Sequence, residues 1–154
     1  MTAIIRTTFF ALTLFPCLCS SVLADISQWV GIYRGVGVIE QTDGKRNEIH
    51  CELHIIEDNS QDFPEVLTIK YSQDLAIIQI RNLGSAPKHL TVQMTDNALS
   101  IAPLFAHPIS IKLQKDPGGF NETLLVGDLV EYTVSYAQEP KTDSTLHLKL
   151  GKLQ

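Results

Sequence analysis

Cysteine is scarce in this chain, which has only three among its 154 residues. Cys17 and Cys19 fall near the N-terminus, so Cys51 is alone in the rest of the chain. Within residues 25–154, a single cysteine has no partner for a disulfide. Residues 25–154 are long enough for one domain with its own hydrophobic core, so the fold does not need that cross-link. Cys51 alternates with aliphatic neighbours, which predicts an inert, inward-facing thiol.

Positive charge is also sparse, and it is scattered. The chain carries 12 Lys and Arg against 17 Asp and Glu, for a formal net charge of −5. Nucleic acids and anionic membrane surfaces are bound through clustered Lys and Arg, and the sequence has no such cluster. The composition therefore argues against both as partners, and the acidic balance favours solubility.

The sequence motifs of common catalytic sites are missing as well. There is no Gly-x-Ser-x-Gly, no His-Glu-x-x-His, no glycine-rich phosphate loop and, after residue 24, no Cys-x-x-Cys. We therefore predict a protein without catalytic residues and without a cofactor. A modification motif is present at Asn121-Glu122-Thr123, which is an N-glycosylation acceptor if the source is eukaryotic.

A candidate metal site occurs at His50, Glu52 and His54, which share one face of an expected strand. Alternate residues along a strand are about 6.6 Å apart, which separates the two histidines by about 13 Å. Two imidazoles that bind one zinc at about 2 Å each cannot span that distance. We predict a solvated face at these residues and no metal.

A long apolar run occurs only at the N-terminus. Arg6 precedes an apolar stretch from Phe9 to Leu18, and Val22-Leu23-Ala24 has small residues at the two positions that a signal peptidase reads. The stretch has about 10 residues, whereas a membrane-spanning helix needs about 20. We predict a signal peptide over residues 1–24, cleavage before Asp25, and export to the periplasm or the medium. The alternative is an uncleaved N-terminal anchor.

Alternation of apolar and polar residues dominates the rest of the sequence, where no window of ten residues keeps a helical period. The clearest element is a hairpin in which Trp29–Gln41 and Arg46–Glu57 flank an Asp-Gly turn. Further strands are expected at Glu65–Tyr71, Leu75–Arg81, Lys88–Thr95, Ala98–Ala102, His107–Lys115, Thr123–Val126, Leu129–Gln138 and Ser144–Leu153. Short connections between them predict one all-β domain, an antiparallel meander of about eight to ten strands closed as a barrel, with a β-sandwich as the alternative.

The turn of the hairpin also predicts its register. A two-residue turn pairs Val38 with Ile49 and Val36 with Cys51, so that both partners of each pair are apolar. The inward face of the hairpin would then carry Val30, Ile32, Val36, Val38, Ile49, Cys51, Leu53 and Ile55. The outward face would carry Trp29, Gly31, Tyr33, Gly35, Gly37, Glu48, His50, Glu52 and His54.

The first strand resembles that of a known family. Trp29-Val30-Gly31-Ile32-Tyr33-Arg34-Gly35 opens an antiparallel meander on a glycine-rich, coiled strand. In this the chain resembles the calycin barrels, which include lipocalins, fatty-acid-binding proteins and nitrobindin-like domains. The family pattern places a glycine before the tryptophan, whereas here Trp29 precedes Gly31. The resemblance implies a small lipocalin-like barrel that carries or senses a small apolar molecule, and it assigns no binding residue.

The inward side chains decide whether such a barrel has room for a ligand. An eight-stranded interior is just wide enough for side chains or for one small molecule, and the many Leu and Ile favour a filled core. Any ligand inside would be apolar and held by a few polar groups. The candidate ligand-binding residues are Arg34, Tyr71, Tyr132 and Tyr136. For Arg34 the alternative is an outward position beside a bulge at Gly35.

The expected strand at residues 75–80 is apolar on both faces, which predicts that both faces are covered. The cover is either another part of the fold or a protein partner, and the candidate interface residues are Trp29, Tyr33, Ile78 and Ile80. Two functions therefore remain for a non-catalytic exported protein. It carries or senses a small apolar ligand inside a barrel, or it is an extracellular or envelope interaction module with a filled core and an apolar outer face.

Overall fold

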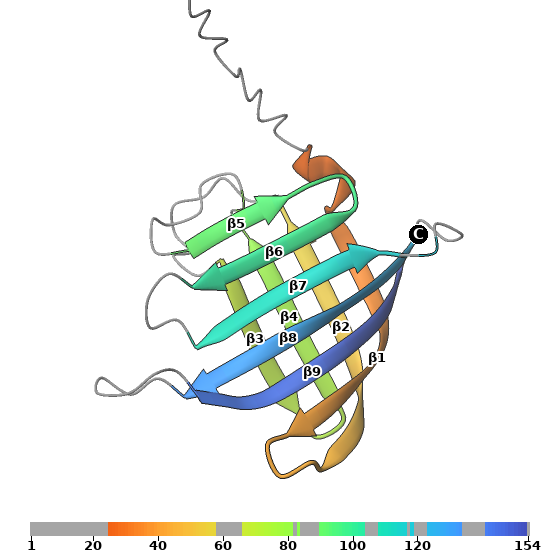
Figure 1. Cartoon of the computed structure of the whole chain (residues 1–154). Helices are drawn as coiled ribbons and strands as arrows, with labels where there is room; N and C mark the ends of the chain where they lie inside the picture. The colour runs from red at the N-terminus through yellow and green to blue at the C-terminus, as the bar shows by residue number, and fades with distance from the viewer. Residues whose placement is uncertain are drawn as a thin grey trace, which may run out of the picture.

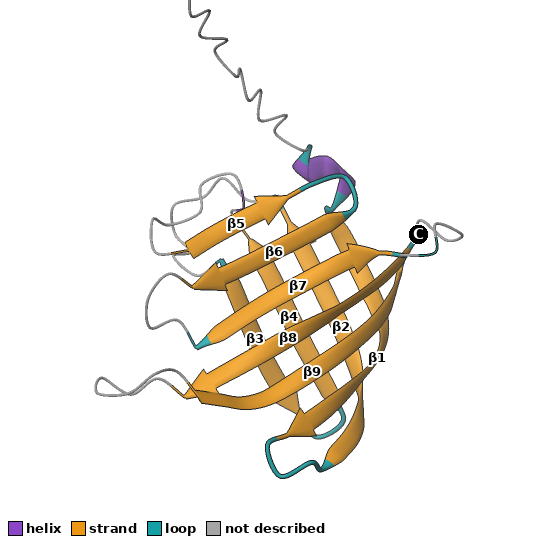
Figure 2. Cartoon of the chain, in the orientation of Figure 1, coloured by secondary structure: helices purple, strands orange, loops and turns teal. Residues whose placement is uncertain are grey.

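The computed structural model describes residues 25–57, 66–81, 83, 90–103, 108–116, 118, 123–133 and 141–153. Within them the chain forms one short 3₁₀ helix and nine strands of a single curled sheet (Figures 1 and 2). The elements are η1 (Ile26–Gln28), β1 (Gly31–Gln41), β2 (Arg46–Ile56), β3 (Leu67–Ser72), β4 (Leu75–Arg81), β5 (Leu90–Met94), β6 (Ala98–Pro103), β7 (Ile109–Lys115), β8 (Leu124–Thr133) and β9 (Lys141–Lys152). The predicted all-β class is confirmed. The predicted signal peptide, Tyr136 and Asn121 lie outside the described residues.

β4 lies between β2 and β3, and this makes the sheet mixed. The strand order is β3-β4-β2-β1-β9-β8-β7-β6-β5, in which β2 and β4 are parallel and the other neighbours are antiparallel. The predicted antiparallel meander is therefore wrong at this place. β4 is apolar on both faces, and one of its faces is buried while the other is half-buried. β3 exposes Lys70 and Ser72, and such polar residues are typical of an edge strand.

The sheet curls into a half-barrel, so that one half of it faces the other. Strands β5–β9 cross in front of strands β1–β4 in Figure 1. A hydrophobic core lies between the two halves and receives buried side chains from all nine strands. This architecture is compatible with a β-barrel fold. The largest fully buried side chains are Trp29, Leu53, Ile55, Leu67, Ile78, Ile80, Leu99, Ile101, Ile111, Leu125, Leu129 and Leu146.

Trp29 closes one end of the half-barrel, next to η1. Its side chain is fully buried, and its indole Nε1–H donates to the carbonyl of Thr95 in the β5–β6 turn at 3.0 Å. The ammonium of Lys115 lies 4.9 Å from the centre of the indole ring, within the range of a cation–π contact. The hydroxyl of Tyr33 donates to the carbonyl of Trp29 at 2.8 Å. The outward position predicted for Trp29 and Tyr33 is therefore wrong.

The register of the first hairpin differs from the prediction by one residue. Ile49 pairs with Gly37 rather than with the next residue along β1. The chain turns through three residues, because the N–H of Gln41 donates to the carbonyl of Lys45 at 2.9 Å. Gly44 adopts a φ of 82° in this loop, a backbone conformation that glycine favours. Because the side-chain period of a strand is two, the shift of one residue turns over both faces of β1.

The shift exchanges buried and exposed side chains along β1. Tyr33 is 2% exposed, whereas Ile32 and Val36 are 42% and 38% exposed. The predicted inward positions are wrong for Ile32, Val36 and Val38 in this strand and for Val30 just before it. Arg34 takes the outward position that was its alternative. The prediction for the second strand of the hairpin is confirmed by the buried side chains of Cys51, Leu53 and Ile55.

One continuous strand, β8, replaces the two strands that were expected around residues 123–138. It pairs with β7 on one side and β9 on the other without a break at Gly127 or Asp128. Pairing on both sides thus overrides the local turn signal of this Gly-Asp pair. Leu125 and Leu129 are buried, so Tyr132 lies on the outer face. The predicted inward position of Tyr132 is wrong for this reason.

Cys51 is 1% exposed, and burial raises the pKa of its thiol to about 11. The thiol of the unfolded chain ionises near 9.0, so the unfolded state binds fewer protons than the folded state between these pH values. We expect the free energy of unfolding to fall by about 2 kcal/mol between pH 9 and 11 from this group. Urea denaturation followed by circular dichroism over this pH range measures the loss.

The matched control is Cys51→Ala, which removes this ionisation and leaves the tyrosines in place. Tyr33 and Tyr71, whose pKa values are also raised by burial, contribute in both proteins. The variant is less stable at every pH, but its stability should decline less steeply between pH 9 and 11. Equal slopes in the two proteins would show that the thiol is not shielded from water.

Candidate functional site

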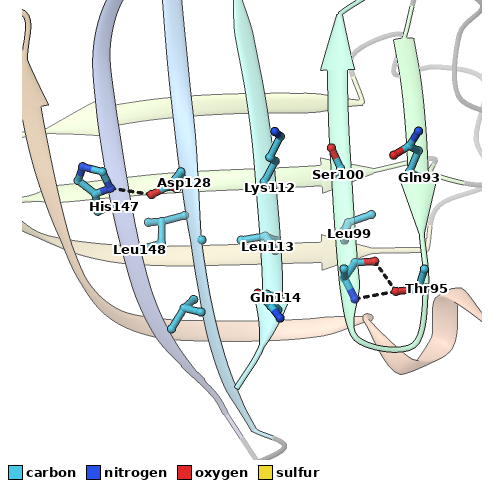
Figure 3. Close-up of a pocket in the computed structure, with 13 residues that line it drawn as sticks. Gln93, Thr95, Leu99, Ser100, Lys112, Leu113, Gln114, Asp128, His147 and Leu148 are labelled. Atoms are coloured by element: carbon cyan, nitrogen blue, oxygen red, sulfur yellow. Dashed lines mark hydrogen bonds and ion pairs between the residues drawn. The ribbon is translucent and has the colours of Figure 1, made fainter. Parts of the chain in front are cut away.

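A groove of about 650 Å³ runs across the outer face of strands β5–β9 (Figure 3). It crosses the strands, and its polar side chains stand on the face that is turned away from the core. The residues that line it are Gln93, Thr95, Ala98, Leu99, Ser100, Lys112, Leu113, Gln114, Val126, Gly127, Asp128, His147 and Leu148.

The first wall of the groove is a row of five residues, one from each strand. Gln93 pairs with Ser100, Ser100 with Lys112, Lys112 with Asp128, and Asp128 with His147. Figure 3 shows Ser100, Lys112 and Asp128 side by side on neighbouring strands. The pairing register therefore assembles residues from positions 93 to 147 into one line.

The second wall is shorter and follows the next outward positions of the same strands. Gln114 pairs with Ala98 on one side and with Val126 on the other. Thr95 lies in the adjoining turn, where its hydroxyl accepts the N–H of Ala98 at 2.9 Å. This wall is less polar than the first, because Ala98 and Val126 contribute only hydrocarbon.

The floor of the groove is the backbone between the two walls. Leu99, Leu113 and Leu148 belong to it, and their side chains are buried on the opposite face. Gly127 pairs with both Leu113 and Leu148. A Cβ at Gly127 would lie 2.1 Å from the carbonyl oxygen of Lys112, so β7 and β8 approach closely here only because this residue has no side chain.

Charged side chains at the β9 end of the groove compensate one another. His147 Nδ1 lies 2.6 Å from Asp128 Oδ1, and its Nε2 lies 3.6 Å from Glu40 Oε2 on β1. The same Glu40 oxygen is 2.6 Å from the guanidinium of Arg46. Asp128 and Glu40 thus each have a partner within this exposed chain of contacts.

Four polar side chains of the groove are free to bind something else. Gln93, Ser100, Lys112 and Gln114 have no hydrogen-bond or ion-pair partner in the part of the chain that the structure describes. All four are exposed or half-exposed. A ligand here would replace the hydrogen bonds that these groups make with water, without breaking any contact among the residues that the structure describes.

The groove does not assemble a Ser-His-Asp triad. His147 and Asp128 are in contact, but Ser100 is three strands away from His147 in the row. Neighbouring strands are about 4.8 Å apart, which separates Ser100 from His147 by about 14 Å. A serine nucleophile needs its base within about 3 Å, so this row is not arranged as a catalytic triad.

The residues that the sequence singled out for ligand binding do not meet. Arg34 lies on the outer face, where its Nε is 2.7 Å from Glu52. Tyr132 is also on the outer face, with its hydroxyl 3.2 Å from Ser110. Tyr71 lies near the end of β3 and donates a short hydrogen bond to Glu131 of β8. These three candidates therefore have separate partners at separate places.

The local chemistry at two of these places is structural. Burial, followed by the hydrogen bond to Glu131, raises the pKa of Tyr71, so that it remains a donor near neutral pH. On the outer face, the hydrogen bond with His54, at 3.0 Å, lowers the pKa of Glu52, and Arg34 acts in the same direction. Among the described residues no group of three His, Cys, Asp or Glu is arranged to hold a metal ion.

The four candidate interface residues are all inside the fold. Trp29, Ile78 and Ile80 are fully buried, and Tyr33 is 2% exposed. The two-faced apolar strand β4 is thus covered on its inner face by the core, while Leu75 and Ile77 on its outer face are half-buried. Sequence reasoning missed the groove because each of its polar residues, taken alone, looked like an ordinary surface residue.

A scan against protein-family models, a search of curated proteins and a search of solved structures each find no match to this chain. In the part that the structure describes, no helix is both long enough and apolar enough to span a membrane.

Proposed function

We propose that this protein is an exported, non-catalytic binding module whose binding site is the groove across β5–β9. The observation that carries the proposal is the set of four unpartnered polar side chains on an open, preformed surface. Such convergent polar groups around a concavity are the usual sign of a binding site. Export rests on the pattern of residues 1–24, and the absence of catalysis rests on the missing sequence motifs of common catalytic sites.

A carrier with an apolar ligand inside a calycin-like barrel is the competing function. The curled sheet is compatible with such a barrel, but the described interior carries closely packed Leu and Ile side chains. Placing a ligand there would require these side chains to move apart, at a cost in packing free energy. The groove needs no such rearrangement, and this favours binding on the outer face.

Photo-crosslinking in the native host tests the groove, because it captures whichever molecule occupies the site. We would place p-benzoylphenylalanine at Gln114 and, as a matched control, at Lys70, which is exposed on the outer face of β3. After irradiation, intact-protein mass spectrometry should show an adduct at Gln114 and none at Lys70. Adding Ser100→Arg, which fills the groove with a longer side chain, should abolish the adduct.

Two outcomes would count against the proposal. Equal labelling at both positions, or none at Gln114, would show that the groove is not a binding site. Saturable binding of the fluorescent fatty acid 11-(dansylamino)undecanoic acid, displaced by oleic acid and unaffected by Ser100→Arg, would establish the carrier function instead. That result would also overturn the argument from the packed interior.

A further inference from the structure

The free polar groups of the groove recur at the spacing of the strands. Gln93, Ser100 and Lys112 are cross-strand neighbours, and Asp128 and His147 continue the same row. Neighbouring strands are about 4.8 Å apart, so the five residues extend over about 19 Å. A ligand that lies along this row meets one polar side chain per strand. The fit therefore depends on how closely the length of the ligand's repeating unit matches the spacing of the strands.

An extended peptide fits this spacing poorly. Its side chains return to the same face every two residues, about 6.7 Å, so a peptide laid across the strands loses register within two strands. Its main chain would also lack partners, because the backbone groups in the floor pair within the β6–β9 ladder. Peptides gain affinity by adding to a free sheet edge, and the groove crosses the sheet instead.

The chemistry of the row matches hydroxyl groups. Gln93 and Ser100 each offer both a donor and an acceptor, as does Gln114 in the second wall, and a sugar hydroxyl also donates and accepts. Lys112 stands next to Asp128, and Asp128 is paired with His147, so the row has no excess of one charge. This balance favours a neutral ligand over a polyanion or a polycation.

From this spacing and chemistry we infer that the groove binds an unbranched, neutral oligosaccharide that lies across the strands with about one sugar ring per strand. The inference rests on the proposed function, and it adds the class of ligand. A pyranose ring in an extended chain is about as long as the strand spacing, so successive rings keep the register that a peptide loses. The row of five strands then accommodates about four or five rings.

The test is to titrate the full-length protein with cello-, xylo-, manno- and chito-oligosaccharides of two to six rings and to measure the affinity by isothermal titration calorimetry. With the series that fits, affinity should rise with each added ring and level off at four or five. Gln93→Ala, Lys112→Ala and Gln114→Ala should each weaken binding by about 3- to 10-fold, the effect of one net hydrogen bond. Lys70→Ala on the outer face of β3 should leave the affinity unchanged.

The outcomes separate this inference from the proposed function. If none of the four series binds, but the crosslink at Gln114 still forms and is lost in Ser100→Arg, the groove is a binding site for another ligand and only this inference falls. If oligosaccharides bind equally well to Ser100→Arg, they bind elsewhere and the inference falls. If neither the crosslink nor oligosaccharide binding occurs, both proposals fall.

Discussion

Replacing Gly35 by alanine is expected to lower the free energy of unfolding by about 4 kcal/mol, close to the largest effects that single substitutions produce. A Cβ at this position would lie 2.1 Å from the carbonyl oxygen of Lys149 and 3.0 Å from the Cα of Leu150. Both atoms belong to the backbone of β9, which is paired with β1 at this point. The new methyl group can therefore be accommodated only if the two strands separate and lose ladder hydrogen bonds.

Two other glycines provide matched controls for Gly35→Ala. At Gly37 an added Cβ would meet the ends of flexible side chains, Leu146 at 2.6 Å and Cys51 at 2.7 Å, which can partly move aside. At Gly44 nothing lies within 4 Å, and only the φ of 82° penalises alanine, by about 1 kcal/mol. Urea denaturation should rank the losses as Gly35, then Gly37, then Gly44. Equal losses of stability for Gly35→Ala and Gly44→Ala would show that the backbones of β1 and β9 leave room for a Cβ at Gly35.

Trp29→Ala is expected to cost about 3–5 kcal/mol, the usual range for a fully buried aromatic side chain. The substitution empties the closed end of the half-barrel and removes the hydrogen bond to Thr95 and the contact with Lys115. Trp29→Phe keeps most of the apolar volume, so its loss should be smaller. Because Trp29 is the single tryptophan of the chain, thermal unfolding of these variants is followed by circular dichroism rather than by fluorescence.

The control for Trp29→Ala is Ile32→Ala in the neighbouring strand. Ile32 is a large apolar residue, but 42% of it is exposed, and we expect its truncation to cost about 1 kcal/mol or less. A two-residue turn would impose a register that places Ile32 in the core and Trp29 on the surface. In that register the larger loss of stability would come from Ile32→Ala. A larger loss for Ile32→Ala than for Trp29→Ala would therefore contradict the observed pairing of β1 with β2.

Local alternation predicted well those strands in which a single face is apolar. In β2 the residues expected on the inward face are buried, including Cys51 and Leu53. The bounds of β4, which is apolar on both faces, also match the prediction. The prediction of the first hairpin failed at a single point, its turn, because an Asp-Gly pair fits a two-residue turn and also the end of a three-residue loop. The apolar residues of β1 did not resolve this choice, since Ile32, Tyr33 and Val36 occupy both of its faces.

The parallel pairing of β2 with β4 and the groove could not be predicted from neighbouring residues. β4 forms a hairpin with β3 and also pairs with β2. The strands β2 and β4 are therefore neighbours in the sheet although β3 lies between them in the sequence. The row from Gln93 to His147 depends on four separate registers, and a shift of one residue in any of them would dissolve it.

By itself, the sequence determined the all-β class, the position of most strands and the burial of Cys51, because these follow from side-chain alternation within a few residues. It also determined the sparse and scattered positive charge that argues against polyanionic partners. The tertiary structure alone decided which face of β1 is buried, where β4 is inserted, and which polar side chains share the groove. These features depend on long-range strand pairing, whose outcome is a balance over the whole sheet and is not encoded in any one segment.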